Sequence, residues 1–225
     1  MTGTLINVGT IITGTFIGMV VKARMPERIT QTTMDGIGLF TIFVGLSMLL
    51  ESQNMLIVLF SIVLGTITGS LLDINGRLER AANNLESRFA KDRSGLAQGF
   101  LAASLLFCVG PMAILGSIEN GLTGSYPILM TKALMDGFSS VIFGATMGIG
   151  VALSALPLLL YQGALTLGAS VVKEALTDLA MTEMTATGGL LIVGIGINML
   201  GIKKISVADM LPAIAIAVLL AHLFP

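Results

Sequence analysis

Eight long apolar segments dominate this sequence and limit what the chain can fold into. An α-helix needs about 20 mostly apolar residues to cross a hydrocarbon layer ~30 Å thick, and fewer when it is partly buried in protein. The chain is 54% hydrophobic and 11% charged, which excludes an ordinary water-soluble domain. The sequence therefore predicts an all-α polytopic membrane protein with about eight transmembrane helices. They are expected at residues 4–21, 27–50, 55–72, 96–117, 127–150, 156–172, 186–202 and 207–224.

Basic residues gather at three of the seven connections between these segments. Ten of the 12 Lys and Arg residues lie at the connections that follow the first, third and seventh segments. Cytoplasmic connections of membrane proteins carry an excess of Lys and Arg, so these three are predicted to face the cytoplasm. Both termini and the acidic connection at 173–185 would then be external. We expect a multi-pass membrane protein with this orientation.

A longer polar stretch, residues 73–95, separates the third and fourth segments. Apolar residues recur there at helical spacing from Leu78 to Phe89, which favours an amphipathic helix lying on the cytoplasmic surface. The simplest interpretation is an amphipathic linker between two halves of the chain. A surface that binds a partner or senses lipid is the alternative.

A motif at the start of the second segment recurs at the start of the fifth. Residues 25–37, MPERITQTTMDGI, align without a gap on residues 126–138, YPILMTKALMDGF, and both contain the frame P-x8-DG. We interpret the match as a trace of two three-helix repeats, residues 1–72 and 96–172, followed by a C-terminal helix pair, residues 173–225. Because each repeat crosses the membrane three times, the second is inverted relative to the first. Inverted repeats are typical of secondary transporters, and channels also contain them.

Each copy of the motif places an aspartate, Asp35 or Asp136, about 13 Å along a helix that starts at a proline. We expect Asp136 at membrane depth, whereas polar residues before Asp35 keep it near the cytoplasmic headgroups. An ionisable group in the membrane costs about 2.5–3.5 kcal/mol on insertion scales and marks an ion or substrate pathway by default. Both are therefore candidate coupling-ion or proton sites. The alternatives are a helix N-cap and, for Asp136, an ion pair with Lys132 one turn earlier.

Further polar residues within the apolar segments are candidate ligands for a solute or ion. They are Asn7, Ser140, Ser154, Gln162 and Asn198. Each has an alternative role, since buried Asn, Gln and Ser often join neighbouring helices by hydrogen bonds. Glycines and Pro157 beside Ser154 allow a non-helical stretch after the fifth segment, where freed carbonyls would bind a cation. A tight cytoplasmic turn is the alternative there.

Small residues recur four positions apart in three places. The pairs are Gly14/Gly18, Gly65/Gly69 and Gly144/Gly148. Such pairs let helices approach closely, either within one chain or in a homodimer. The stretch GPMAILG, residues 110–116, predicts a kink in the fourth segment.

Several function classes lack their sequence signatures. The chain has no GxxxxGK[ST] motif for ATP, neither aspartate lies in the GxGD motif of intramembrane proteases, and no basic patch interleaves with aromatic residues. We expect no enzyme activity, no nucleic-acid partner and no cofactor, with Na⁺ or H⁺ as the coupling ion. The expected partners are the lipid bilayer, a small solute or ion, and a second copy of the chain.

Four stretches of the chain carry a family resemblance. They are GTLINVGTIITGTFIG at 3–18, KALMDGF at 132–138, GVALSALPLLLYQGALTL at 150–167 and GGLLIVGIGINMLGIKKISVADMLP at 188–212. The chain resembles the bacterial membrane-protein family of unknown function number 554 (YqgA/YdfK-like) along essentially its whole length. The resemblance implies a polytopic inner-membrane protein and brings no assigned substrate or binding residue.

Together these features favour a secondary transporter of a small solute or ion that works by alternating access. In this hypothesis Asp136, and with it Asp35, handles a proton or Na⁺. The alternative is a channel or a structural, oligomeric membrane protein without active transport.

Overall fold

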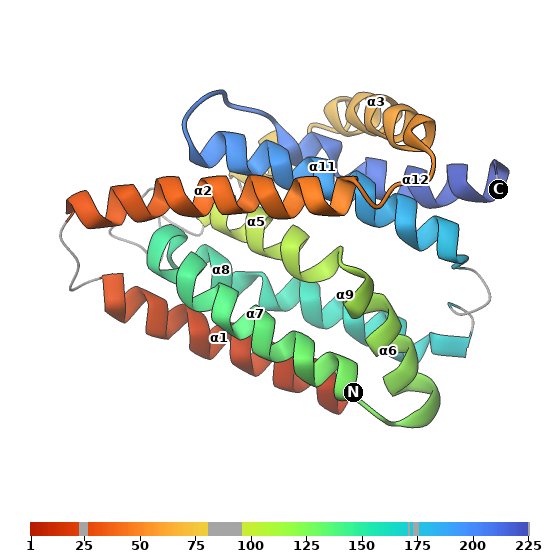
Figure 1. Cartoon of the computed structure of the whole chain (residues 1–225), viewed down its shortest axis with the longest axis horizontal. Helices are drawn as coiled ribbons and strands as arrows, with labels where there is room; N and C mark the ends of the chain where they lie inside the picture. Colours follow the sequence, from red (N-terminus) through yellow and green to blue (C-terminus); the bar gives the residue numbers. More distant parts are fainter. Residues whose placement is uncertain (23–26, 81–95, 171, 173–175, 225) are drawn as a thin grey trace. The chain divides into compact units, whose positions relative to one another are not determined.

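The computed structural model describes residues 1–22, 27–80, 96–170, 172 and 176–224, and these residues form helices and no strand (Figure 1). Each of the eight predicted segments contains at least one helix. The named helices are α1 (Thr2–Lys22), α2 (Glu27–Leu49), α3 (Met55–Leu71), α5 (Leu96–Cys108), α6 (Pro111–Thr123), α7 (Pro127–Met147), α8 (Gly150–Leu153), α9 (Ala155–Leu167), α11 (Asp178–Met199), η1 (Val207–Met210) and α12 (Pro212–Leu223). The all-α prediction is confirmed.

Within the described ranges, five helical segments are long and apolar enough to cross a membrane, and two bent helix pairs raise this number to seven. The five are Thr2–Lys22, Gln31–Leu49, Pro127–Met147, Gly150–Leu167 and Asp178–Met199. The bent pairs are Met55–Leu71 with Ile74–Arg80, at 53°, and Leu96–Cys108 with Met112–Thr123, at 57°. The eighth predicted segment contains a shorter apolar helix, Val207–Leu223. The polytopic architecture is confirmed, and eight crossings stays a prediction.

The fourth segment breaks where the sequence predicts a kink. α5 ends at Cys108, Gly110 is extended, and Pro111 starts α6. Proline has no N–H to donate, so it fits the first turn of a helix and not its interior. The fifth and sixth segments are joined by a tight turn, in which Gly148 has a φ of 70° that favours glycine. This turn is one of the two structures that the sequence allowed there.

The prediction of an acidic connection at 173–185 is partly wrong, because α11 already begins at Asp178. The Thr177 side chain caps this helix by accepting a hydrogen bond from Ala180 N at 3.1 Å. Asp178 lies in the first turn, where the helix dipole favours a negative charge. These two residues start the helix eight residues before the predicted position 186, so Glu183 lies inside α11.

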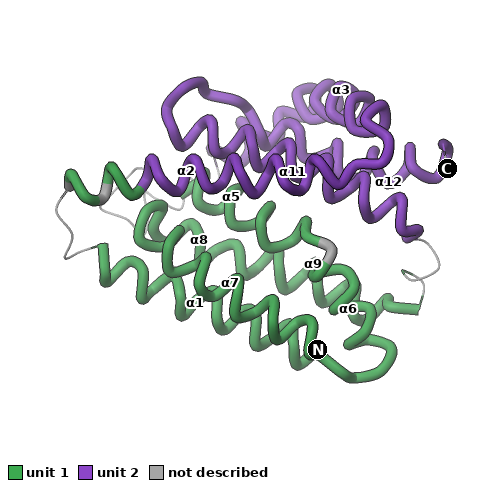
Figure 2. The backbone as a smooth tube through the Cα atoms, viewed as in Figure 1, with its two compact units in different colours: residues 1–33, 94–175 green, residues 34–93, 176–225 purple. Residues whose placement is uncertain are grey.

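The chain divides into two compact units that each contain segments distant in sequence (Figure 2). Unit 1 comprises residues 1–33 and 94–175, and unit 2 comprises residues 34–93 and 176–225. The second predicted repeat, 96–172, lies within unit 1. The first, 1–72, is shared between the units, with α1 in unit 1 and α3 in unit 2. The relation between the two repeats stays a prediction.

Unit 1 contains a tightly packed parallel helix pair, α1 and α7. Along α1, Gly3 lies against Leu129 and Gly14 lies against Gly137, so residue numbers rise together along the two helices. A Cβ built on Gly14 would lie 2.5 Å from Gly137 O, and one on Gly144 would lie 2.6 Å from Thr15 O. The two backbones therefore touch, and any larger side chain would separate them.

Unit 2 contains two antiparallel pairs. α2 packs on α11, with Gly38 against Leu200 and Gly45 against Gly189, so residue numbers run in opposite directions. α3 packs on α12 and η1 through Gly65 and Gly69, and a small apolar core joins α3, α11 and α12. This core consists of Ile57, Ala180, Ala217 and Ala221.

Five of the six paired glycines make close contacts within the chain, and the sixth, Gly148, lies in the turn after α7. Gly14 and Gly18 pack on α7, Gly144 packs on α1, and Gly65 and Gly69 pack on the Asp209–Ala213 region. Close packing inside each unit therefore accounts for these residues, and the predicted homodimer stays a prediction without support from them.

Residues 81–95 of the predicted amphipathic linker, 73–95, lie outside the described residues. The described part forms the short helix Ile74–Arg80, which bends by 53° from α3. Unit 2 anchors its start, because Asn75 N donates to Asp209 Oδ1 at 2.8 Å.

Candidate functional site

The buried polar side chains of α7 form a stripe along one face of the helix. Lys132, Asp136 and Ser140 are spaced four residues apart, so all three face other helices of unit 1. Their exposed fractions are 5%, 7% and 0%. The neighbouring helix α1 contributes Asn7, which is fully buried. We call these four residues the Asp136 cluster.

Asp136 accepts two hydrogen bonds at one carboxylate oxygen. Lys132 Nζ donates to Asp136 Oδ2, and Asn7 Nδ2 donates to the same atom at 2.8 Å. The Lys132 ammonium also lies 5.8 Å from the centroid of the Phe107 ring on α5, within the range of a cation–π contact. The structure thus contains the ion pair that the sequence offered as one role for Asp136. It also brings Asn7 and Asp136, both predicted site residues, into contact.

Several polar atoms in and beside the Asp136 cluster are buried without a hydrogen-bond partner in the part of the chain that the structure describes. Asn7 Oδ1 and Ser140 Oγ belong to the cluster, and Thr4 Oγ1 lies one turn before Asn7 on α1. Asp136 holds the amide nitrogen of Asn7, so the amide oxygen must point elsewhere. Leaving a buried polar atom without a partner costs about 1–3 kcal/mol. These oxygens are therefore candidate ligand atoms in unit 1.

A second buried amide in unit 1 is also unsatisfied. Gln162 on α9 is fully buried, and neither of its amide atoms has a partner among the described residues. α9 packs against the start of α1, since a Cβ on the adjacent Gly163 would lie 3.5 Å from Met1 Cε. Gln162 therefore remains a candidate ligand in the same unit as the Asp136 cluster.

The remaining predicted site residues have different surroundings. Ser154 is buried between α8 and α9 and donates its hydroxyl to Val151 O at 2.6 Å. In unit 2, the Asn198 amide bonds both main-chain groups of Ile205, at 2.8 and 2.7 Å, and closes the turn after α11. Asp35 belongs to unit 2, and its side chain is exposed on α2. Ser154 and Asn198 thus make local hydrogen bonds to nearby main chain, whereas the sequence offered hydrogen bonds between neighbouring helices as their alternative role.

Sequence reasoning missed a second buried carboxylate, Glu183 in unit 2. It is fully buried on α11 and accepts hydrogen bonds from Ser52 Oγ at 2.8 Å, Gln53 N at 2.7 Å and Asn54 N at 2.9 Å. These donors belong to the turn between α2 and α3, so Glu183 holds that turn on α11. A Thr-Asp pair followed by an apolar run is a helix-start signal, and it could have placed Glu183 in a helix.

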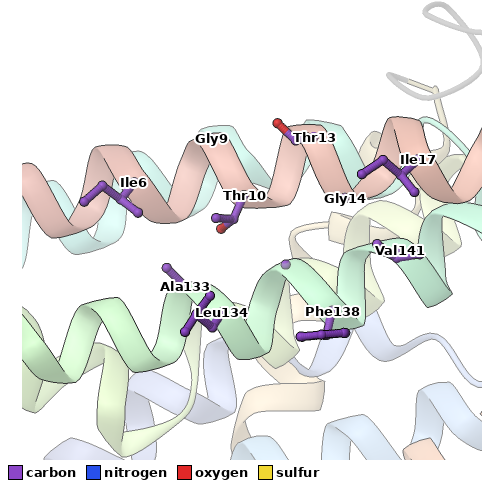
Figure 3. Close-up of a pocket in the computed structure, with 11 residues that line it drawn as sticks. Ile6, Gly9, Thr10, Thr13, Gly14, Ile17, Ala133, Leu134, Phe138 and Val141 are labelled. Carbon is purple, nitrogen blue, oxygen red and sulfur yellow. The ribbon is translucent and has the colours of Figure 1, made fainter.

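An apolar groove of about 440 Å³ runs along the seam between α1 and α7 (Figure 3). Ile6, Leu134, Phe138 and other residues on both helices line it, and the Asp136 cluster does not. Thr10, its most central polar residue in Figure 3, already donates its hydroxyl to Asn7 O at 2.9 Å. The groove therefore offers apolar surface, while the charged chemistry of unit 1 lies in the Asp136 cluster.

The sequence comparisons agree with this architecture. The model of the family described as "Protein of unknown function (DUF554)" matches residues 2–222. The chain belongs to this family. The resemblance expected from the sequence motifs is thereby confirmed, and it extends from α1 to α12.

Two relatives match over nearly their whole lengths. The uncharacterized membrane protein YdfK of Bacillus subtilis (strain 168) is 33% identical over 220 residues, which cover 96% of this chain and 93% of the relative. The uncharacterized protein YqgA of Escherichia coli (strain K12) is 29% identical over 220 residues, with 96% and 94% coverage. No solved structure matches the chain. The family and the helices together identify a polytopic helical membrane protein.

Proposed function

We propose that this protein is a secondary transporter of a small solute or ion, coupled to Na⁺ or H⁺, and that Asp136 binds the coupling ion. The observation that carries the proposal is the buried contact of Asp136 with Lys132 and Asn7 in the α1–α7 pair. Ionisable groups within transmembrane helices mark ion or substrate pathways by default. Asp35, the matching aspartate of the predicted inverted repeat, is a second candidate for the same role.

A purely structural role does not account well for the Asp136 cluster. Replacing a buried ion pair by apolar residues of similar volume is often neutral or stabilising, so stability alone gives α7 no reason to keep one. A polar network that only joins helices is also expected to satisfy its members. Asn7 Oδ1 and Ser140 Oγ have no partner among the described residues, so both oxygens can take part in binding an ion.

The direct test is transport by the full chain reconstituted into liposomes. Uptake of ²²Na⁺ and of a panel of radiolabelled amino acids, sugars and organic acids would be measured under imposed Na⁺ or H⁺ gradients, with protein-free liposomes as blanks. We expect at least one saturable, gradient-driven flux. Asp136→Asn is expected to lower this flux at least tenfold, while Asp73→Asn, which also neutralises one aspartate, leaves it unchanged.

Two results would reject parts of the proposal. A flux that is unchanged in Asp136→Asn, with unchanged Na⁺ and pH dependence, would remove Asp136 from the mechanism. A folded protein that moves none of these probes under any gradient would favour the alternative of a structural membrane protein. A flux that does not saturate would favour a channel. Asp35→Asn in the same assay decides whether the second aspartate takes part.

A further inference from the structure

We propose that the Asp136 cluster is a binding site for a small monovalent cation of the sodium type, and that Lys132 is a tethered cation that occupies Asp136 when the ion is absent. This inference rests on the proposed function and names its coupling ion. It goes further by giving Lys132 a role as an internal competitor.

The oxygen atoms of the cluster suit a hard cation. Asp136 uses only Oδ2 for its two hydrogen bonds, and both donors are side chains that can move. The Asn7 amide contacts Asp136 through its nitrogen, and rotation of this amide would bring its oxygen, Oδ1, to the ion at the carboxylate. Ser140 Oγ follows one turn later on the same face of α7. Carboxylate, amide and hydroxyl oxygens are the ligands that hard cations prefer.

The charge of the cluster limits the cation to a single positive charge. One carboxylate can neutralise one positive charge, and here the Lys132 ammonium neutralises it. The described residues contain no group of three or more His, Cys, Asp or Glu side chains that would hold a divalent or transition metal. A monovalent cation that replaces the ammonium on Asp136 neutralises the carboxylate as the ammonium does, whereas a divalent cation would leave an excess positive charge on it.

Lys132 already lies near an aromatic ring while it holds Asp136. Its ammonium lies 5.8 Å from the centre of the Phe107 ring, and Phe107 is fully buried on α5. An aromatic ring face stabilises a desolvated cation, and lysine has a flexible four-carbon stem. Binding of the ion and movement of the ammonium toward Phe107 would thus be two parts of one exchange. An ammonium that must yield to the ion lowers the affinity of the site for that ion.

Sodium binding by the purified full chain tests this inference without any transport assay. In choline buffer at constant pH, ²²Na⁺ binding and the rise of Tm with added NaCl would be measured for the wild type and four variants. We expect saturable binding of about one ion per chain, and its loss in Asp136→Asn. Lys132→Gln is expected to bind Na⁺ at least tenfold more tightly, because the tethered competitor is gone.

Two further variants make the test specific. Lys204→Gln removes the same charge from an exposed lysine of unit 2, so its Na⁺ affinity is expected to match the wild type. Lys132→Arg keeps the positive charge, and a guanidinium holds a carboxylate through two parallel bonds. Lys132→Arg is therefore expected to bind Na⁺ at least tenfold more weakly, and it serves as the decisive variant if Lys132→Gln does not fold.

The outcomes separate the inference from the proposed function. No saturable Na⁺ binding by the wild type, or equal affinity in the wild type and the two Lys132 variants, would overturn the inference, and the orphaned oxygens would then hold only water. Transport driven by protons without Na⁺ binding would overturn the inference and keep the transporter. Saturable Na⁺ binding that depends on Asp136 and Lys132 as expected, in a protein that moves nothing, would keep the site and reject the transporter.

Discussion

Two buried carboxylates, Asp136 in unit 1 and Glu183 in unit 2, have opposite kinds of partners. Asp136 is held by two side chains, the ammonium of Lys132 and the amide of Asn7. Glu183 is held by two main-chain N–H groups and a hydroxyl of the turn 52–54. Side-chain partners can swing away and be exchanged for a ligand, whereas main-chain donors can leave only if the turn itself unfolds. The same chemical group thus has exchangeable partners in unit 1 and fixed partners in unit 2.

The largest expected effect in this comparison is the loss of stability in Glu183→Leu. Removal of the carboxylate leaves two main-chain donors and one hydroxyl without a partner, at about 1–3 kcal/mol each. We expect the free energy of unfolding in detergent to fall by about 5 kcal/mol on this basis. Asp178→Asn on the exposed first turn of α11 is the control, with an expected loss of about 0.5 kcal/mol. If Glu183→Leu keeps its stability but loses its flux, Glu183 takes part in transport and does not serve only to hold the turn 52–54.

The next effect concerns the partner of Asp136. Lys132→Met leaves a buried charge uncompensated, so the free energy of unfolding in Na⁺-free buffer is expected to fall by about 4 kcal/mol. Adding Asp136→Asn removes that charge and keeps an acceptor for Asn7, so the double variant is expected to recover most of this loss. Equal stability of the single and double variants would show that the uncompensated charge of Asp136 does not cause the loss of stability. No second substitution is expected to rescue Glu183→Leu, because its donors belong to the main chain.

A smaller effect is expected for Asn198, whose amide bonds the main chain of Ile205. Asn198→Ala removes two hydrogen bonds of about 1 kcal/mol each, so we expect the free energy of unfolding to fall by about 2 kcal/mol. The flux of the folded protein is expected to stay unchanged. A loss of flux without a loss of stability would instead return Asn198 to the candidate ligands of the transport site.

The smallest effect is expected for Asp73, an exposed carboxylate in the polar connection after α3. The hydrogen bond from Arg80, 2.7 Å from Asp73 Oδ2, lowers the pKa of this carboxyl below its ordinary value of 3.8. A lowered folded-state pKa stabilises the fold above the unfolded-state pKa, and this contribution is lost as the pH falls through the folded-state value. The small Tm difference between the wild type and Asp73→Asn is therefore expected at pH 6 and should shrink as the pH falls below 3.8 and through the lowered folded-state pKa. A Tm difference that persists in acid would mean that the charge of Asp73 is not its cause.

The sequence predicted the helices because hydropathy and helix-start signals act locally. The Pro127 start placed Asp136 well inside a helix, and the four-residue spacing offered an ion pair with Lys132 as one of its roles. Glu183 was misplaced for a local reason as well, since its acidic neighbours resembled an external connection. In the sequence alone, a segment with several acidic residues near a helix start is easily assigned to an exposed loop, because the hydrogen-bond donors that bury one of the carboxylates are distant in sequence.

Contacts between distant segments could not be predicted from the sequence. Asn7 and Asp136 are 129 residues apart, and their contact depends on the parallel packing of α1 on α7. That packing is set by backbone contacts at Gly14 and Gly144, which local patterns describe only as small residues. The division into two units depends on the same kind of contact between distant segments. The split of the first predicted repeat therefore could not be predicted either.

The parallel pairing of α1 with α7 has a consequence for how the protein is made. The ribosome synthesises α1 well before α7, because 129 residues separate Asn7 from its partner Asp136. During this interval Asn7 and the glycine face of α1 lack their intramolecular partners. The α1–α7 pair therefore forms only after α7 has been synthesised, and a nascent chain that stops before α7 leaves the Asn7 amide without Asp136 as its partner.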